Sequence, residues 1–243
     1  MARKPARSKA RRSTPRSAPP AAGTPREKIV AAFMDLLAGK SIETISLTEI
    51  AEHADVSLAD LRGEFASPVA ILSAHVKDLD RQVLAGSDPD MEEEDPRERL
   101  FDVLMRRLEL LAPHKEAVRS LIRSARRNPP LALALNAMAV RSQQWMLTAA
   151  GIGASGPKGM VRSQGLALLF ANVLRTWVDD DDDQTRTLAA LDNQLARGQR
   201  FAGLLDEMCR IPQAACAFRE RLRGARRSAR RSRDDYDDDR AMA

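Results

Sequence analysis

The feature that most constrains the fold is a series of helix-start signals spaced closely along the chain. Residues 24–27 (TPRE) and 46–49 (SLTE) are capping boxes, in which side-chain oxygens satisfy backbone N–H groups that a helix leaves unpaired. Ser57, three residues before Asp60, and Ser67, just before a proline, give the same indication further on. Helix formers dominate between these signals, and aromatic residues make up only 4% of the chain. The sequence therefore predicts an all-α fold.

The first three predicted helices are short and close together, and a tight turn joins the last two. The first should place its apolar residues on one face and end at Gly39 in a left-handed conformation. Asp55 tolerates the left-handed backbone that the turn requires, and Val56 can fill the core beneath it. A tight turn between two short helices is the expected form of a helix-turn-helix unit.

Residues 26–72, from REKIVAAF to SPVAIL, resemble the head of the TetR family of transcription regulators, with its signature phrases at TEIAEHADVS and LRGEF-x-S. The resemblance implies a three-helix helix-turn-helix head and a larger helical body that binds a ligand and dimerises. It places the third helix in the major groove of DNA. The implied DNA-binding residues are Ser46, Thr48, Ser57, Leu58, Ala59 and Arg62.

Charge and helix signals divide the chain into five segments. We expect a disordered basic arm over residues 1–23, the head over 24–68, a connecting helix over 69–86, a helical effector-binding and dimerisation domain over 95–222, and a disordered charged tail over 223–243. Within the body, prolines and a Gly-rich stretch separate the helices, whose starts include Asp95, Met160 and Gln184.

Apolar residues at helical spacing in the body suggest two sites. A ligand pocket is expected around Leu104, Leu121, Met138, Trp145 and Phe170, although plain core packing gives the same pattern. The segment 160–178 is apolar around more of its circumference than one neighbouring layer covers, which indicates an interface. We expect a homodimer through this helix and the next, with contacts at Leu166, Phe170, Val173, Trp177, Leu191 and Leu195.

The charge of the head bears directly on DNA binding. Residues 25–83 carry six basic and ten acidic residues, a net charge of −4, whereas contacts with phosphates need positive charge. The arm supplies seven basic residues and no acid, so it is either a DNA-binding arm or a solubilising tail. Along the recognition helix Leu58, Asp60 and Glu64 depart from the usual family pattern. Only Arg62 retains the capacity to read guanine or grip a phosphate.

No motif for catalysis, metal binding or membrane insertion stands out. The three histidines are scattered, and there is no phosphate-binding glycine loop, GxSxG or HExxH. The acids of 179–183 lack the spacing of a calcium loop and fit better as helix-end charges, and Cys209 and Cys216 lack metal-ligand spacing. No apolar stretch is long enough to span a bilayer, and no secretory signal is present. We therefore expect a cytoplasmic protein that is not an enzyme and needs no cofactor or metal.

Two functions remain open. The resemblance favours a dimeric regulator that binds double-stranded DNA and responds to a small apolar ligand. The alternative is a lipid-binding accessory protein of the ubiquinone-biosynthesis type, which keeps a TetR-like fold but does not read DNA. Residues 177–183, with Thr187 and Leu191-Asp192, are weakly similar to the C-terminal part of that protein. The basic stretch 212–233 could then lie on an anionic membrane surface.

Overall fold

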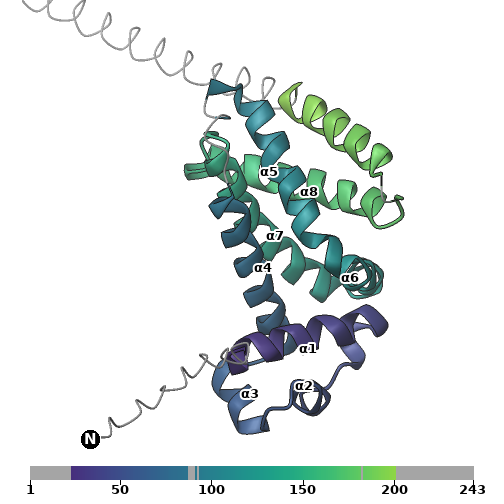
Figure 1. Ribbon diagram of the computed structural model, residues 1–243. Coiled ribbons are helices and arrows are strands. Elements are labelled where there is room, and N and C mark those ends of the chain that lie inside the picture. The colour runs from purple at the N-terminus through teal and green to yellow at the C-terminus, as the bar shows by residue number, and fades with distance from the viewer. Residues whose placement is uncertain (1–22, 87–90, 92, 182, 201–243) are drawn as a thin grey trace, which may run out of the picture.

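The computed structural model describes residues 23–86, 91, 93–181 and 183–200, and the elements in these ranges are all helices (Figure 1). The all-α expectation is thus confirmed for the described chain. None of the described helices is long and apolar enough to cross a membrane. The elements are α1 (Pro25–Gly39), η1 (Ile42–Thr44), α2 (Leu47–His53), α3 (Leu58–Glu64), α4 (Pro68–Ala85), α5 (Pro96–Leu111), η3 (Ala112–His114), α6 (Lys115–Arg127), α7 (Pro129–Ala149), α8 (Gly156–Trp177) and a last helix over residues 185–200.

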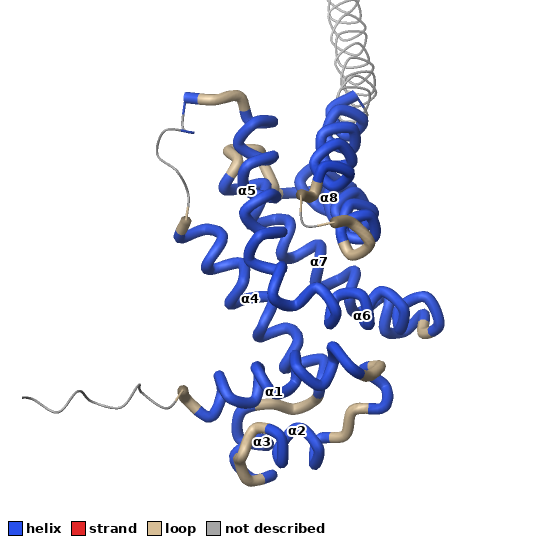
Figure 2. Tube along the Cα trace, turned by 45° about the vertical axis from the view of Figure 1, so that its right-hand side comes forward, coloured by secondary structure: helices blue, strands red, loops and turns tan. Residues whose placement is uncertain are grey.

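The helices form a small head and a larger body. Helices α1, α2 and α3 make the head at one end of the molecule, and α4 leads from it into the body, where it packs against α5 and α7 (Figures 1 and 2). Helix α8 packs on α7, and the helix over 185–200 lies at the end of the body away from the head. The expected arm (1–23) and tail (223–243) lie outside the described residues, except for Gly23, as do both cysteines.

The predicted caps set most of the helix starts. Thr24 forms a complete capping box with Glu27, and Ser67 accepts a bond from the backbone N–H of Ala70 at 3.2 Å. At Ser46 only half of the expected box forms. Its hydroxyl accepts from the Glu49 N–H at 3.1 Å, but the Glu49 carboxylate pairs with the ammonium of Lys40 instead of returning to the cap. An ion pair with Lys40 thus replaces the expected local bond between the Ser46 N–H and the Glu49 carboxylate.

Three helix-end expectations need correction. Gly39 is not left-handed, because Lys40 leaves α1 in an extended conformation while its N–H satisfies the Leu36 carbonyl at 3.0 Å. Asp95 precedes α5 but makes no side-chain cap bond. Helix α8 begins at Gly156 rather than at Met160, because Gly156 supplies a left-handed φ of 68° where the chain turns into the helix.

The acidic run after α8 acts as a helix-end cap. The Asp180 carboxylate accepts bonds from the N–H and the hydroxyl of Thr187, at 2.7 and 2.6 Å, and from the guanidinium of Arg186 at 2.8 Å. The Thr187 hydroxyl, followed by Arg186 and backbone N–H groups, holds the pKa of Asp180 well below its usual range. This arrangement at the start of residues 185–200 confirms the helix-end interpretation of the aspartates.

The apolar core has two parts. One, the head core, joins residues of α1 to α4 with Ala117 on α6 and with Leu131 and Met138 on α7. The other, the body core, is built around Leu104, Phe170, Trp177 and Leu191. Each fully buried large apolar side chain stabilises the fold by about 1.5–3 kcal/mol. Because the head core includes side chains from α6 and α7, the head is packed firmly onto the body.

Candidate nucleic-acid interface

The turn between α2 and α3 adopts the geometry expected of a helix-turn-helix unit. Asp55 has a left-handed φ of 51°, and the N–H of Val56 donates to the Ala51 carbonyl at 3.1 Å. Val56 is half-buried against the head core, and Ala54 beside it is buried. Asp55 therefore supplies the left-handed turn residue and Val56 the core-facing side chain, as the sequence predicted.

Helix α3 is anchored along one face and exposed along the other. Leu61 and Phe65, at its C-cap, are buried in the head core. At the other end the Ser57 hydroxyl accepts from the Asp60 N–H at 3.1 Å and donates to the Asp60 carboxylate at 2.6 Å. Asp60 therefore serves as a capping partner, which explains one acid at a position where the family usually carries a DNA-contacting residue.

The six residues expected to contact DNA are all exposed, on α2, α3 and their caps, at the end of the molecule away from the body (Figures 1 and 2). Leu58 is the most notable of them, since 51% of this large apolar side chain is exposed. Arg62 has no ion-pair or hydrogen-bond partner within the described ranges. Its guanidinium is therefore available for a ligand.

Two acidic residues of the head have basic partners within the head. The guanidinium of Arg26 lies 3.5 Å from the Glu64 carboxylate and 4.8 Å from the centre of the Phe65 ring. The ammonium of Lys40 lowers the pKa of Glu49, mainly through its hydrogen bond. Glu64 and Glu49 thus have local counter-ions, and because Arg26 and Lys40 are already counted in the net charge of the head, that charge remains −4.

The structure does not bring the five expected pocket residues together. Leu104 and Phe170 belong to the body core, whereas Met138 belongs to the head core, against which Leu121 is packed. Trp145 is 58% exposed on α7. These side chains are ordinary core or surface residues in this conformation, so spacing along the helices did not identify a common pocket.

The six side chains expected at a dimer interface lie on the inner faces of their helices. Leu166, Phe170, Val173 and Trp177 all face the body core, and Leu191 and Leu195 pack there with them. Side chains buried within one chain are not available to a second copy. The outward face of α8 instead carries Val161 and Leu168, which are exposed. Periodicity identified 160–178 as unusually apolar, but it did not show which of its faces packs in the body core.

A buried polar cluster escaped the sequence analysis. Asp80 on α4 accepts bonds from the guanidinium of Arg107 on α5 and, at 2.7 Å, from the hydroxyl of Ser142 on α7. The Arg107 guanidinium also lies 5.8 Å from the centre of the Phe170 ring. The Nε of Arg107 and the Oε1 of buried Gln143 lack hydrogen-bond partners in the described part of the protein. The sequence contained one indication of this cluster, because Arg107 is a charged residue within the row of leucines on α5.

The described helices thus form a helix-turn-helix head that one helix, α4, joins to a larger helical body. No protein-family model and no curated protein matches the sequence. Among solved structures, a TetR transcriptional regulator from Nitrosomonas europaea is similar, with a TM-score of 0.58 and 21% identity over 73% of this chain and 99% of that chain.

Two further regulators have the same arrangement. A tetR-family transcriptional regulator from Streptomyces coelicolor gives a TM-score of 0.51 at 14% identity, over 76% of this chain and 84% of that chain. A TetR transcriptional regulator from Rhodococcus sp. RHA1 gives 0.50 at 19% identity, over 72% and 95%. The chain therefore has the TetR-like fold, as the head motifs indicated.

Proposed function

We propose that the protein is a ligand-responsive transcription regulator that binds double-stranded DNA as a homodimer. The observation that carries this proposal is the exposed recognition helix α3, anchored by Leu61 and offering an unpaired guanidinium at Arg62. The exposed hydroxyls of Ser46 and Thr48 at the start of α2 are suited to phosphate contacts. The seven basic residues of the arm supply the positive charge that the head lacks.

The proposed ligand binds in the body next to the buried polar cluster. The body core there is packed with leucine, methionine and phenylalanine side chains, while Arg107 Nε on α5 and Gln143 Oε1 on α7 are buried without a hydrogen-bond partner within the described ranges. A small, mainly apolar molecule with one polar group fits this chemistry, because it would satisfy those atoms without burying a bare charge. Asp80 would carry the effect to the head, since it lies on α4, which connects the two parts.

The proposed homodimer uses the outward faces of the last two described helices. Val161 and Leu168 on α8 and Leu188 on the next helix are large apolar side chains exposed to solvent. Pairing these faces about a two-fold axis would bury them and set the spacing of two heads. This replaces the interface that the sequence pattern predicted with one on the opposite face of the same helices.

Binding-site selection followed by fluorescence anisotropy tests the proposal. Arg62→Ala should weaken binding to the selected site by about 1–3 kcal/mol and weaken binding to random DNA much less. Arg141→Ala, which removes an exposed arginine from α7 in the body, is the matched control and should leave both affinities unchanged. If selection yields no preferred site and Arg62→Ala behaves like Arg141→Ala, the head does not read DNA and the regulator hypothesis fails. A lipid retained by the purified protein would then favour the accessory-protein alternative.

A further inference from the structure

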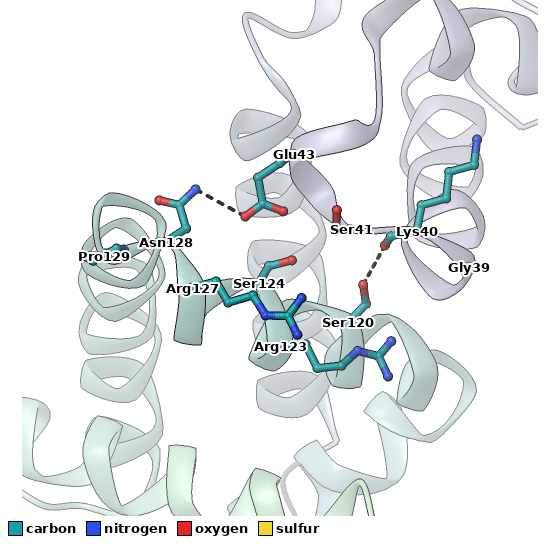
Figure 3. Close-up of a pocket in the computed structure, with 10 residues that line it drawn as sticks. All are labelled: Gly39, Lys40, Ser41, Glu43, Ser120, Arg123, Ser124, Arg127, Asn128 and Pro129. Carbon is teal, nitrogen blue, oxygen red and sulfur yellow. Dashed lines mark hydrogen bonds between the residues drawn. The ribbon is translucent and has the colours of Figure 1, made fainter.

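A polar cavity of about 470 Å³ lies where the head meets the body. One wall is the end of α1 and the following turn, Gly39 to Glu43, and the other is formed by α6 and the start of α7 (Figure 3). Two hydrogen bonds join the walls. The Ser120 hydroxyl donates to the Lys40 carbonyl at 2.6 Å, and the Asn128 amide donates to the Glu43 carboxylate at 3.3 Å. These two bonds connect the head wall of the cavity to its body wall.

The α6 wall of this cavity offers hydrogen-bond donors without partners. Arg123 and Arg127 line it one helical turn apart, and neither has an ion-pair or hydrogen-bond partner among the described residues. Like charges at this spacing repel each other unless an anion lies between them. Between them Ser124 is only 4% exposed, and its hydroxyl, which lines the same cavity, has no partner in hydrogen-bonding geometry in the described chain.

The opposite wall offers an acceptor. The pKa of Glu43 is lowered mainly by the backbone N–H of its own residue. Loss of hydration on burial opposes this shift, and the nearby side chains of Ser124, Asn128 and Ser41 lower the pKa further. Its carboxylate is therefore ionised at neutral pH. A plain anion would be attracted by Arg123 and Arg127 but repelled by Glu43, whereas an anion that also carries a hydrogen-bond donor would satisfy both walls.

We infer that this junction cavity is a binding site for a small carboxylate or phosphate anion that also bears a hydroxyl or ammonium donor. The anionic group lies between Arg123 and Arg127 and accepts a bond from Ser124, and the donor faces Glu43. The site is separate from the buried polar cluster of the body. The helix dipole alone accounts for basic residues at the end of α6, but it does not account for a buried hydroxyl that lines the same cavity as two of them.

Isothermal titration of the full-length protein with L-malate and with succinate tests this site. The two dicarboxylates differ only in the hydroxyl, so L-malate should bind saturably and about fivefold more tightly, the worth of one hydrogen bond. Arg123→Gln and Arg127→Gln should each lower the L-malate affinity about tenfold, because each removes a charge-assisted bond. Glu43→Gln should remove most of the preference for L-malate over succinate.

Two variants distinguish binding of L-malate in the cavity from nonspecific electrostatic attraction to the basic residues of α6. Arg126→Gln removes a neighbouring exposed charge that does not line the cavity, so it should leave the affinity unchanged. Ser124→Ala should weaken L-malate binding, because it removes the hydroxyl from which the bound anion accepts a hydrogen bond. Absence of saturable binding, or an Arg126→Gln defect as large as that of Arg127→Gln, would overturn the inference. Neither result depends on whether the head binds DNA.

Discussion

The buried pair of Asp80 and Arg107 allows a quantitative test of how α4 is held to the body. Both side chains are almost completely buried, and the pair joins α4 to α5 while Ser142 adds a bond from α7. Arg107→Met keeps an unbranched stem but removes the guanidinium, which leaves the carboxylate of Asp80 buried with the Ser142 hydroxyl as its remaining side-chain partner. Asp80→Leu, in turn, leaves the guanidinium of Arg107 buried without its counter-ion.

The expected cost follows from the loss of one partner rather than from the strength of the pair. Leaving a buried charge without its counter-ion destabilises a protein by about 3–5 kcal/mol. The Ser142 bond to Asp80 offsets part of this loss, so we expect about 3 kcal/mol for Arg107→Met. The double variant Asp80→Leu/Arg107→Met should be much less destabilised than the sum of the singles, because no buried charge remains.

Urea unfolding followed by circular dichroism measures these differences. Arg81→Met is the matched control, because it lies on the same helix as Asp80 but forms an exposed pair with Asp78, with side chains 75% and 43% exposed. An exposed pair of this kind contributes at most about 1 kcal/mol. If Arg107→Met costs no more than Arg81→Met, or if the double variant is as unstable as the two singles added together, the pair does not hold α4 in this way.

Three further predictions concern other parts of the molecule. Ser46→Ala should lower the free energy of unfolding by about 1 kcal/mol, whereas Thr48→Ala on the same exposed turn should change it much less; equal losses in urea would disprove the capping role. Burial, together with nearby charges, lowers the pKa of His75 from 6.5 to about 4, so the unfolded chain binds more protons between these values and stability should fall as pH drops through this window. His75→Gln should flatten that dependence in urea midpoints at pH 7 and pH 5, and His53→Gln, an exposed control, should not. In sedimentation at micromolar concentration the wild type should be a dimer and Leu168→Glu a folded monomer; a wild-type monomer would contradict the interface.

The sequence predicted the head well because its decisive interactions are local. Thr24, Ser57 and Ser67 each accept a bond from a backbone N–H three residues away, and Asp55 needs only its own backbone angle to form the turn. Such interactions can be read from residue types at fixed spacing. The failure at Ser46 follows the same logic, since its Glu partner was taken by Lys40, whose position depends on how α1 ends.

The body was harder to predict because its sites depend on contacts between distant segments. An apolar helix such as α8 has several faces that could be buried, and periodicity does not say which one meets its own core and which one a second copy. The junction cavity likewise arises from packing between residues 39–43 and α6, about 80 positions apart, as in the bond from Ser120 to Lys40. No short-range pattern marks such a place.

The routes from body to head suggest how two ligands could act on one recognition helix. Helix α4 passes from Asp80, in the buried polar cluster, directly into the head core at Ile71 and Leu72. Helix α6 reaches the head separately, through the bond from Ser120 to the carbonyl of Lys40. A ligand next to Arg107 would therefore bias α4, whereas an anion at the junction cavity would bias the position of α1 against α6. Because α3 packs on α1 in the same core, both shifts would reorient Arg62 relative to the second head of the proposed homodimer.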